Sequence, residues 1–167
     1  MITKQQTKTQ MLTMSSLFAA LICIFTAYIL HIPFGANGGY IHIGDAMIYL
    51  AATLLPTPYA LLAAGIGGAM ADLLTAPIWA PATFIIKMLI TLPFTNKGTK
   101  IICPRNILAI VSAGLISCFG YALAEIIIYG NEAVIYVSLA SSAIQAIGSG
   151  IIFILMALTL DNIRFKR

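Results

Sequence analysis

Residues 105–129 read RNILAIVSAGLISCFGYALAEIIIY, and within this apolar run charges stand only at Arg105 and Glu125. A helix needs about 20 apolar residues to cross the hydrocarbon core of a bilayer. The run is long enough to do so, and it therefore predicts a membrane-spanning helix that carries an ionisable residue inside it.

The rest of the chain has the same character. Its 167 residues are 60% hydrophobic and only 8% charged, and the mean hydropathy is +1.00. An average soluble domain has about a quarter charged residues. So few charges could not cover a water-facing surface, which excludes a soluble enzyme, a nucleic-acid binder and a disordered tail. We expect residues 1–167 to form a single membrane domain.

Proline and glycine divide the chain into six apolar runs. They predict an all-α fold, a polytopic membrane protein built as a six-transmembrane-helix bundle. The expected spans are residues 12–32, 44–55, 58–76, 79–95, 105–129 and 133–160. The second run is short for a complete span, and the sixth is long enough to tilt in the bilayer.

The basic residues indicate the orientation of the bundle. A six-span count places eight of them on one face, and the positive-inside rule makes that face, with both termini, cytoplasmic. These residues are Lys4, Lys8, Lys97, Lys100, Arg105, Arg164, Lys166 and Arg167. The short loops on the other face carry no Lys or Arg, so we expect them to lie outside a bacterial-type cell membrane.

Four ionisable residues lie within or at the ends of apolar runs: Asp45, Asp72, Lys87 and Glu125. Each would cost about 2.5–3.5 kcal/mol at the centre of a bilayer, so each is expected to face protein or water. At 1.5 Å per residue from the external span ends, Asp45 lies near the surface, Asp72 and Glu125 about 6 Å deep, and Lys87 about 13 Å deep. All four are predicted in the external half.

Neutral polar residues extend this pattern at helical spacing. Thr83 and Thr91 flank Lys87, Ser117 and Tyr121 precede Glu125, and a third stripe runs through residues 138, 142, 145 and 149. Such stripes on three helices predict a cavity that opens outward, with aromatic residues at its mouth. The predicted ligand-binding residues are Tyr40, His42, Asp45, Asp72, Trp79, Thr83, Lys87, Tyr121, Glu125, Ser138, Ser142 and Gln145.

Each of these assignments has a simpler alternative. Asp45 could cap the first turn of its helix, and Asp72 and Lys87 could form a structural ion pair. His42 could be an interfacial residue, as could Trp79, because Trp and Tyr near span ends commonly form an aromatic belt. Only the convergence of the stripes at one depth favours a binding cavity.

Small residues recur at steps of four in the first span. Ser15, Ala19 and Cys23 form one row, with Ser16 and Ala20 beside it. Such a face lets another helix approach closely, so these five residues are the predicted docking face for a partner protein. Packing within the bundle is the alternative.

Absent motifs narrow the function further. The sequence contains no G-x-x-x-x-G-K-[ST] loop, no HExxH and no GxSxG. Its three cysteines are widely spaced and suggest neither a disulfide framework nor a metal cluster. We therefore expect no enzymatic activity, no cofactor, no metal and no nucleic-acid partner.

Three segments resemble the substrate-binding (S) subunits of energy-coupling factor (ECF) vitamin transporters, in the branch of riboflavin, hydroxymethylpyrimidine and pyridoxine carriers. They are residues 39–45 (GYIHIGD), 63–73 (AAGIGGAMADL) and 80–87 (APATFIIK). The resemblance implies six helices that capture a vitamin-type compound outside the cell. It also implies assembly with a transmembrane T subunit and two ATPases, the first span docking the T subunit.

Two other functions stay open. One is an autonomous proton-coupled carrier that uses Asp72, Lys87 and Glu125 as a relay. The other is a membrane enzyme that holds a metal at His31, His42 and Asp45, although these residues are few and irregularly spaced.

Overall fold

The computed structural model describes residues 7–29, 32–33, 40–130, 135–163 and 165. Within these ranges the regular secondary structure is helical apart from one short two-stranded ribbon, which confirms the all-α class. The helices are α1 (Lys8–Ala27), α2 (Gly44–Leu54), α3 (Thr57–Thr75), α4 (Ala80–Leu89), α5 (Pro104–Tyr129) and α6 (Ile135–Asn162), with a 3₁₀ turn, η1 (Pro77–Trp79), before α4. The strands β1 (Ile32–Pro33) and β2 (Tyr40–Ile41) pair antiparallel.

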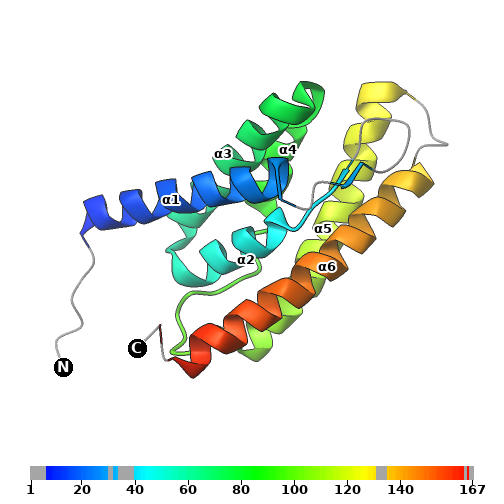
Figure 1. Ribbon diagram of the computed structural model, residues 1–167. Coiled ribbons are helices and arrows are strands. Elements are labelled where there is room, and N and C mark those ends of the chain that lie inside the picture. Colours follow the sequence, from blue (N-terminus) through cyan, green and yellow to red (C-terminus); the bar gives the residue numbers. More distant parts are fainter. Residues whose placement is uncertain (1–6, 30–31, 34–39, 131–134, 164, 166–167) are drawn as a thin grey trace.

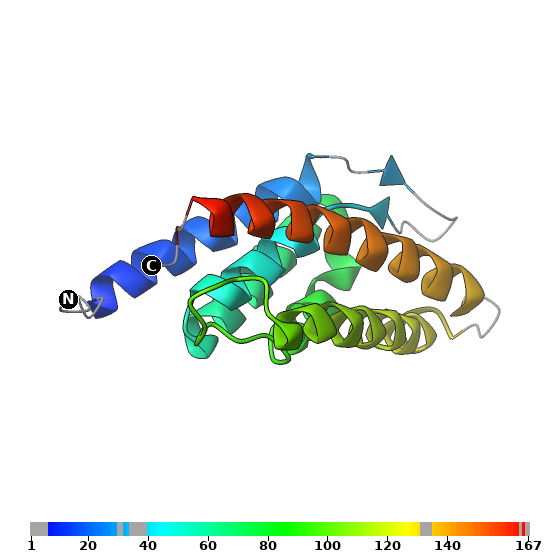
Figure 2. The same cartoon turned by 90° about the horizontal axis from the view of Figure 1, so that it is seen from below.

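The helices form two groups around α2 (Figures 1 and 2). α1 packs on α3 and α3 on α4, while the long helices α5 and α6 pack on each other. The short helix α2 contacts α1, α3 and α6, and ten of its eleven residues are buried. α2 is therefore the central element of the bundle, where its neighbours converge.

Two helices end earlier than the sequence predicts. α1 ends at Ala27, five residues before the expected end, and the chain then enters the β-ribbon. α4 ends at Leu89 and continues in tight turns, in which Thr91 N donates to Met88 O and Leu92 N to Leu89 O. Pro93 accounts for the end of α4, because a proline inside a helix clashes with the carbonyl of the residue four positions earlier, here Leu89.

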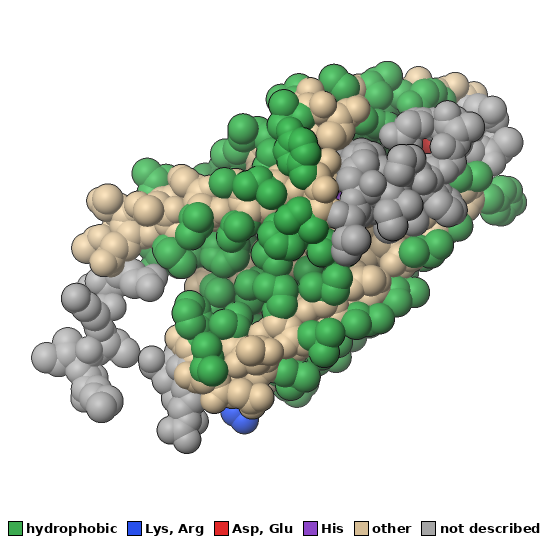
Figure 3. All heavy atoms as spheres, viewed as in Figure 1, with side chains coloured by type: hydrophobic (Ala, Val, Ile, Leu, Met, Phe, Trp, Pro, Cys, Tyr) green, Lys and Arg blue, Asp and Glu red, His purple; other side chains and the backbone are tan. Residues whose placement is uncertain are grey.

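The outer surface of the described helices suits a lipid environment. On α5 the exposed large side chains are apolar at helical spacing, and Figure 3 shows apolar side chains spread over the visible face of the described helices. Four helices (α1, α3, α5 and α6) are long and apolar enough to cross a membrane, whereas α2 and the segment Pro77–Leu89 are shorter apolar helices. The six-span count and the cytoplasmic termini stay predictions.

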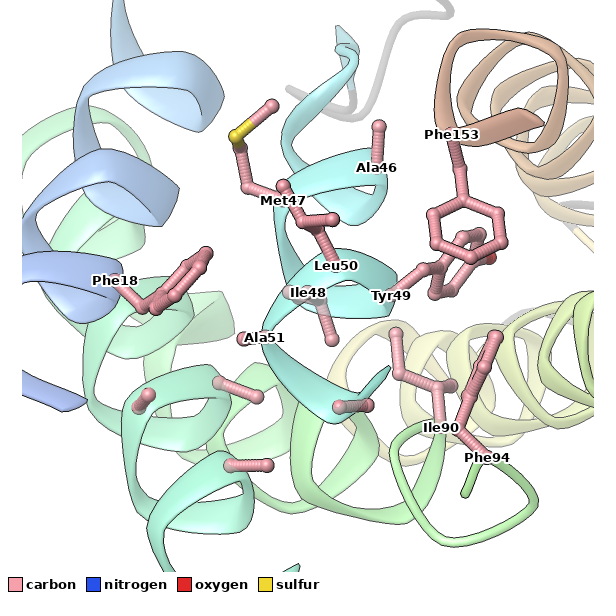
Figure 4. Packing of buried hydrophobic residues seen from close by; sticks show 14 of the residues in the cluster. Phe18, Ala46, Met47, Ile48, Tyr49, Leu50, Ala51, Ile90, Phe94 and Phe153 are labelled. Carbon is pink, nitrogen blue, oxygen red and sulfur yellow. The ribbon is translucent and has the colours of Figure 1, made fainter. Parts of the chain in front are cut away.

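The apolar core gathers around α2 (Figure 4). The Tyr49 ring stacks on Phe94 at 5.0 Å between centroids and meets the edge of Phe153 at 5.9 Å. Phe94 follows α4, and Phe153 lies on α6. One aromatic cluster therefore joins three parts of the chain directly beneath the polar site described below.

α1 and α3 approach each other closely. A Cβ atom added to Gly67 would lie 2.6 Å from the backbone oxygen of Ala19, so only glycine fits at this position. Ser15 donates a hydrogen bond to Tyr59 O at 2.9 Å, and Cys23 is also buried. One row of the small-residue face thus packs inside the bundle, whereas its neighbours Ser16 and Ala20 are exposed.

Polar contacts fasten the segment between α4 and α5 at the opposite end of the bundle. The two carboxylate oxygens of Asp161 on α6 accept from Ile101 N at 2.7 Å and Ile102 N at 2.9 Å. The buried Asn106 amide donates to Thr95 O and Ile101 O. This connection is tied to both long helices.

Candidate functional site

A buried ion pair lies at the centre of the candidate site. Lys87 Nζ on α4 lies 2.6 Å from Asp45 Oδ1 on α2, and the side chains are 1% and 0% exposed. The second carboxylate oxygen, Oδ2, accepts from Gln145 Nε2 on α6 at 2.9 Å. Each oxygen of the buried carboxylate thus has a donor, and the arrangement joins three helices. We call Asp45, Lys87 and Gln145 the polar triad.

The triad bears on two sequence-based expectations. Lys87 pairs with Asp45, not with Asp72, although Asp72 also interacts with it electrostatically. Asp45 was expected near the surface, yet it meets the deepest of the four ionisable residues. The expected depth of Asp45 was wrong because it assumed that the second apolar run begins at the outer surface, whereas α2 begins inside the bundle, where Asp45 is fully buried.

An aromatic wall borders the triad. The Tyr121 ring on α5 lies beneath Lys87 Nζ, 5.2 Å from it, and the Tyr121 hydroxyl bonds to Thr83 Oγ1 at 3.1 Å. The ring of Trp79 lies 6.0 Å from Tyr121 and 6.0 Å from Tyr129. Flat apolar surfaces therefore continue from the charged pair toward the ends of α4 and α5.

His42 links the β-ribbon to the triad. Its Nδ1 accepts from Gly44 N at 2.9 Å, and its carbonyl oxygen accepts from Ser149 Oγ on α6 at 3.5 Å. A side chain at Gly44 would collide with Thr26 of α1. The residues just before Asp45 are thus held between α1 and α6, which fixes where the carboxylate enters the bundle.

The remaining predicted residues share one property, which is burial. Asp72 and Glu125 are at most 5% exposed, and Ser138 and Ser142 are buried on α6. None of these ionisable groups faces lipid, as expected from the cost of exposing charge there.

Tyr40 lies in β2, but its side chain, His31 and residues 34–39 of the external loop lie outside what the structure describes. In the described part of the chain no three His, Cys, Asp or Glu residues form a metal-binding group.

The structure adds two residues that were not among the predicted ligand-binding set. Tyr49 lies one turn after Asp45 on α2, and Ser117 lies one turn before Tyr121 on α5. Both are buried. Their spacing of four from predicted residues was the available signal, but Tyr49 stands in an otherwise apolar run.

Comparison with known protein families agrees with this architecture. A family model described as "ECF-type riboflavin transporter, S component" matches residues 6–162, nearly the whole chain. The chain belongs to this family of ECF S components. It is therefore a substrate-binding membrane subunit of an ECF transporter, which confirms the resemblance noted in the three segments of α2 to α4.

A curated relative is also similar to this S component. An "uncharacterized protein in gap 3'region" from Pyrococcus woesei is 34% identical over 107 residues, which cover 63% of this chain and 72% of the relative. Its description assigns no ligand. The family of the chain is a transporter family and not an enzyme family.

Proposed function

We propose that this S component captures a vitamin or vitamin precursor with a small heteroaromatic ring from outside the cell. The observation that supports this proposal is the polar triad beside the aromatic wall, since directional hydrogen bonds and flat stacking surfaces are what such a ring requires. Trp79 or Tyr40 would stack on the ring, and Lys87, Tyr121, Glu125 and Gln145 would supply polar contacts. His42, Asp45, Asp72, Thr83, Ser138 and Ser142 complete the proposed site.

The charge of the triad bears on the ligand class. Lys87 is the basic residue of the site, and Asp45 already balances its charge at 2.6 Å. A multiply phosphorylated compound would bring several negative charges to a buried region that has no surplus positive charge, which is costly. We therefore favour an uncharged ring compound.

Uptake would require partner proteins. In this proposal a transmembrane T subunit and two ATPases supply the energy, and the complex lies in the plasma membrane. The exposed residues Ser16 and Ala20 of α1 remain the proposed docking positions, since Ser15 and Cys23 are occupied by packing within the chain.

Binding and transport assays test the proposal together. Isothermal titration of the purified protein with riboflavin, pyridoxine and hydroxymethylpyrimidine should show tight binding of one of them. The chain alone in liposomes should bind that compound without concentrating it. Accumulation driven by a proton gradient would instead favour the alternative carrier, in which Asp72, Lys87 and Glu125 relay protons.

A further inference from the structure

Two buried hydroxyl groups have no hydrogen-bond partner in the described part of the chain. They belong to Tyr49 on α2 and Ser117 on α5, and the two residues are 0% and 1% exposed. A buried hydroxyl without a partner destabilises the folded protein, so such groups are expected to serve a purpose. Both lie on helices that contribute to the proposed site.

Tyr49 is held rigidly beside the triad. It follows Asp45 by four residues, so the two lie on the same face of α2. Long side chains on a helix lean toward its N-terminus, here toward Asp45. The Tyr49 ring packs against the rings of Phe94 and Phe153 (Figure 4), and this packing keeps the hydroxyl away from solvent.

Ser117 is brought to the same level by the register of two helices. Thr83 of α4 bonds to Tyr121 of α5, and a Cβ on Gly120 would contact Ile86 at 3.0 Å. Because α4 and α5 run antiparallel, one turn inward from the Thr83–Tyr121 contact brings Lys87 on α4 level with Ser117 on α5. The hydroxyl is therefore buried at the depth of the triad.

We infer that the Tyr49 and Ser117 hydroxyls are specificity-determining contacts that donate hydrogen bonds to the inner edge of the bound compound. This inference rests on the proposed function and narrows it. The ligand would carry acceptors, such as a ring nitrogen or a carbonyl oxygen, on the edge that reaches the triad. Its opposite edge would lie along the aromatic wall of Trp79 and Tyr121.

The test compares ligand affinity with the stability of the ligand-free protein. Tyr49→Phe and Ser117→Ala each remove only the hydroxyl. The exposed Tyr28→Phe and the half-buried Ser112→Ala are the control variants. Ligand affinity is measured by titration with riboflavin, pyridoxine and hydroxymethylpyrimidine. The stability of the ligand-free protein is measured by thermal unfolding.

We expect each test variant to keep or raise the Tm of the ligand-free protein and to weaken binding about tenfold, the value of one good hydrogen bond. Unchanged affinity in both variants would overturn the inference while the proposed function stands. A lower Tm would also overturn it, because the hydroxyl would then have a structural partner. If the wild-type protein binds none of the three compounds, the proposed function fails, and the inference fails with it.

Discussion

The ammonium group of Lys87 lies 2.6 Å from a carboxylate oxygen of Asp45, and neither side chain is exposed beyond 1%. The two residues are 42 positions apart in the sequence, and Gln145 of α6 donates to the other oxygen. An ion pair this deep in an apolar bundle is costly to form and more costly to break. The rest of the site is built around it.

Removing one member of the ion pair should leave a buried charge. Lys87→Met is expected to lower the free energy of unfolding by about 3–5 kcal/mol, since Asp45 loses its cation. Chemical unfolding followed by circular dichroism measures the change. The double variant Asp45→Asn with Lys87→Met should recover much of the loss, because no charge is left unpaired. A single variant as stable as the wild type would contradict the pairing.

Packing of α1 against α3 should depend on one glycine. Gly67→Ala places a Cβ 2.6 Å from a backbone oxygen of α1, and we expect a loss of about 1–3 kcal/mol from overpacking. Gly148→Ala is the matched control, because nothing lies within 4 Å of its added Cβ. The control should be neutral or stabilising, since alanine favours helix. Equal thermal stability of the two variants would refute the close contact.

The carboxylate of Asp161 should stabilise the connection between α4 and α5. Asp161→Ala leaves two backbone N–H groups without their acceptors, at an expected cost of about 1–3 kcal/mol. Limited proteolysis should then cut near residues 97–102 faster than in the wild type. The exposed neighbour Asn162→Ala serves as control and should behave like the wild type. Unchanged stability and an unchanged rate of proteolysis in Asp161→Ala would argue that these two hydrogen bonds do not stabilise the connection.

Assembly with a T subunit should depend on the exposed small residues of α1. Ala20→Leu is expected to reduce co-purification with the T subunit and the ATPases at least several-fold, because a larger side chain prevents close helix approach. Ligand binding by the isolated chain should not change. Val111→Leu, on the exposed face of α5, is the control. Undiminished assembly of the Ala20→Leu variant would place the docking face elsewhere.

Much of the fold was predictable because composition and proline positions report directly on membrane helices. The burial of Asp45, Asp72, Lys87 and Glu125 was also predictable, since lipid does not tolerate exposed charge. The partner of Lys87 was not, because counting residues along a helix cannot reveal that α2 starts inside the bundle.

Other features depend on which way a helix is rotated. A spacing of four marks both the Ser15 row and the Ser16 row of α1, and the sequence does not tell which of them α3 covers. Tyr49 was not among the predicted site residues for a similar reason, since a single tyrosine in an apolar run gives no sign of the direction in which its hydroxyl points. Ligand contact by any of these residues is still a prediction.

The most direct test of the account is ligand binding by the wild type and by Gln145→Leu, measured by titration with riboflavin, pyridoxine and hydroxymethylpyrimidine. Gln145 carries no charge, so its loss disturbs the ion pair least while removing a polar contact of the proposed site. The account predicts that the wild type binds one of the compounds and that the variant stays folded but binds it at least about tenfold more weakly. Equal affinity of the two proteins would contradict a binding site at the Asp45–Lys87–Gln145 triad.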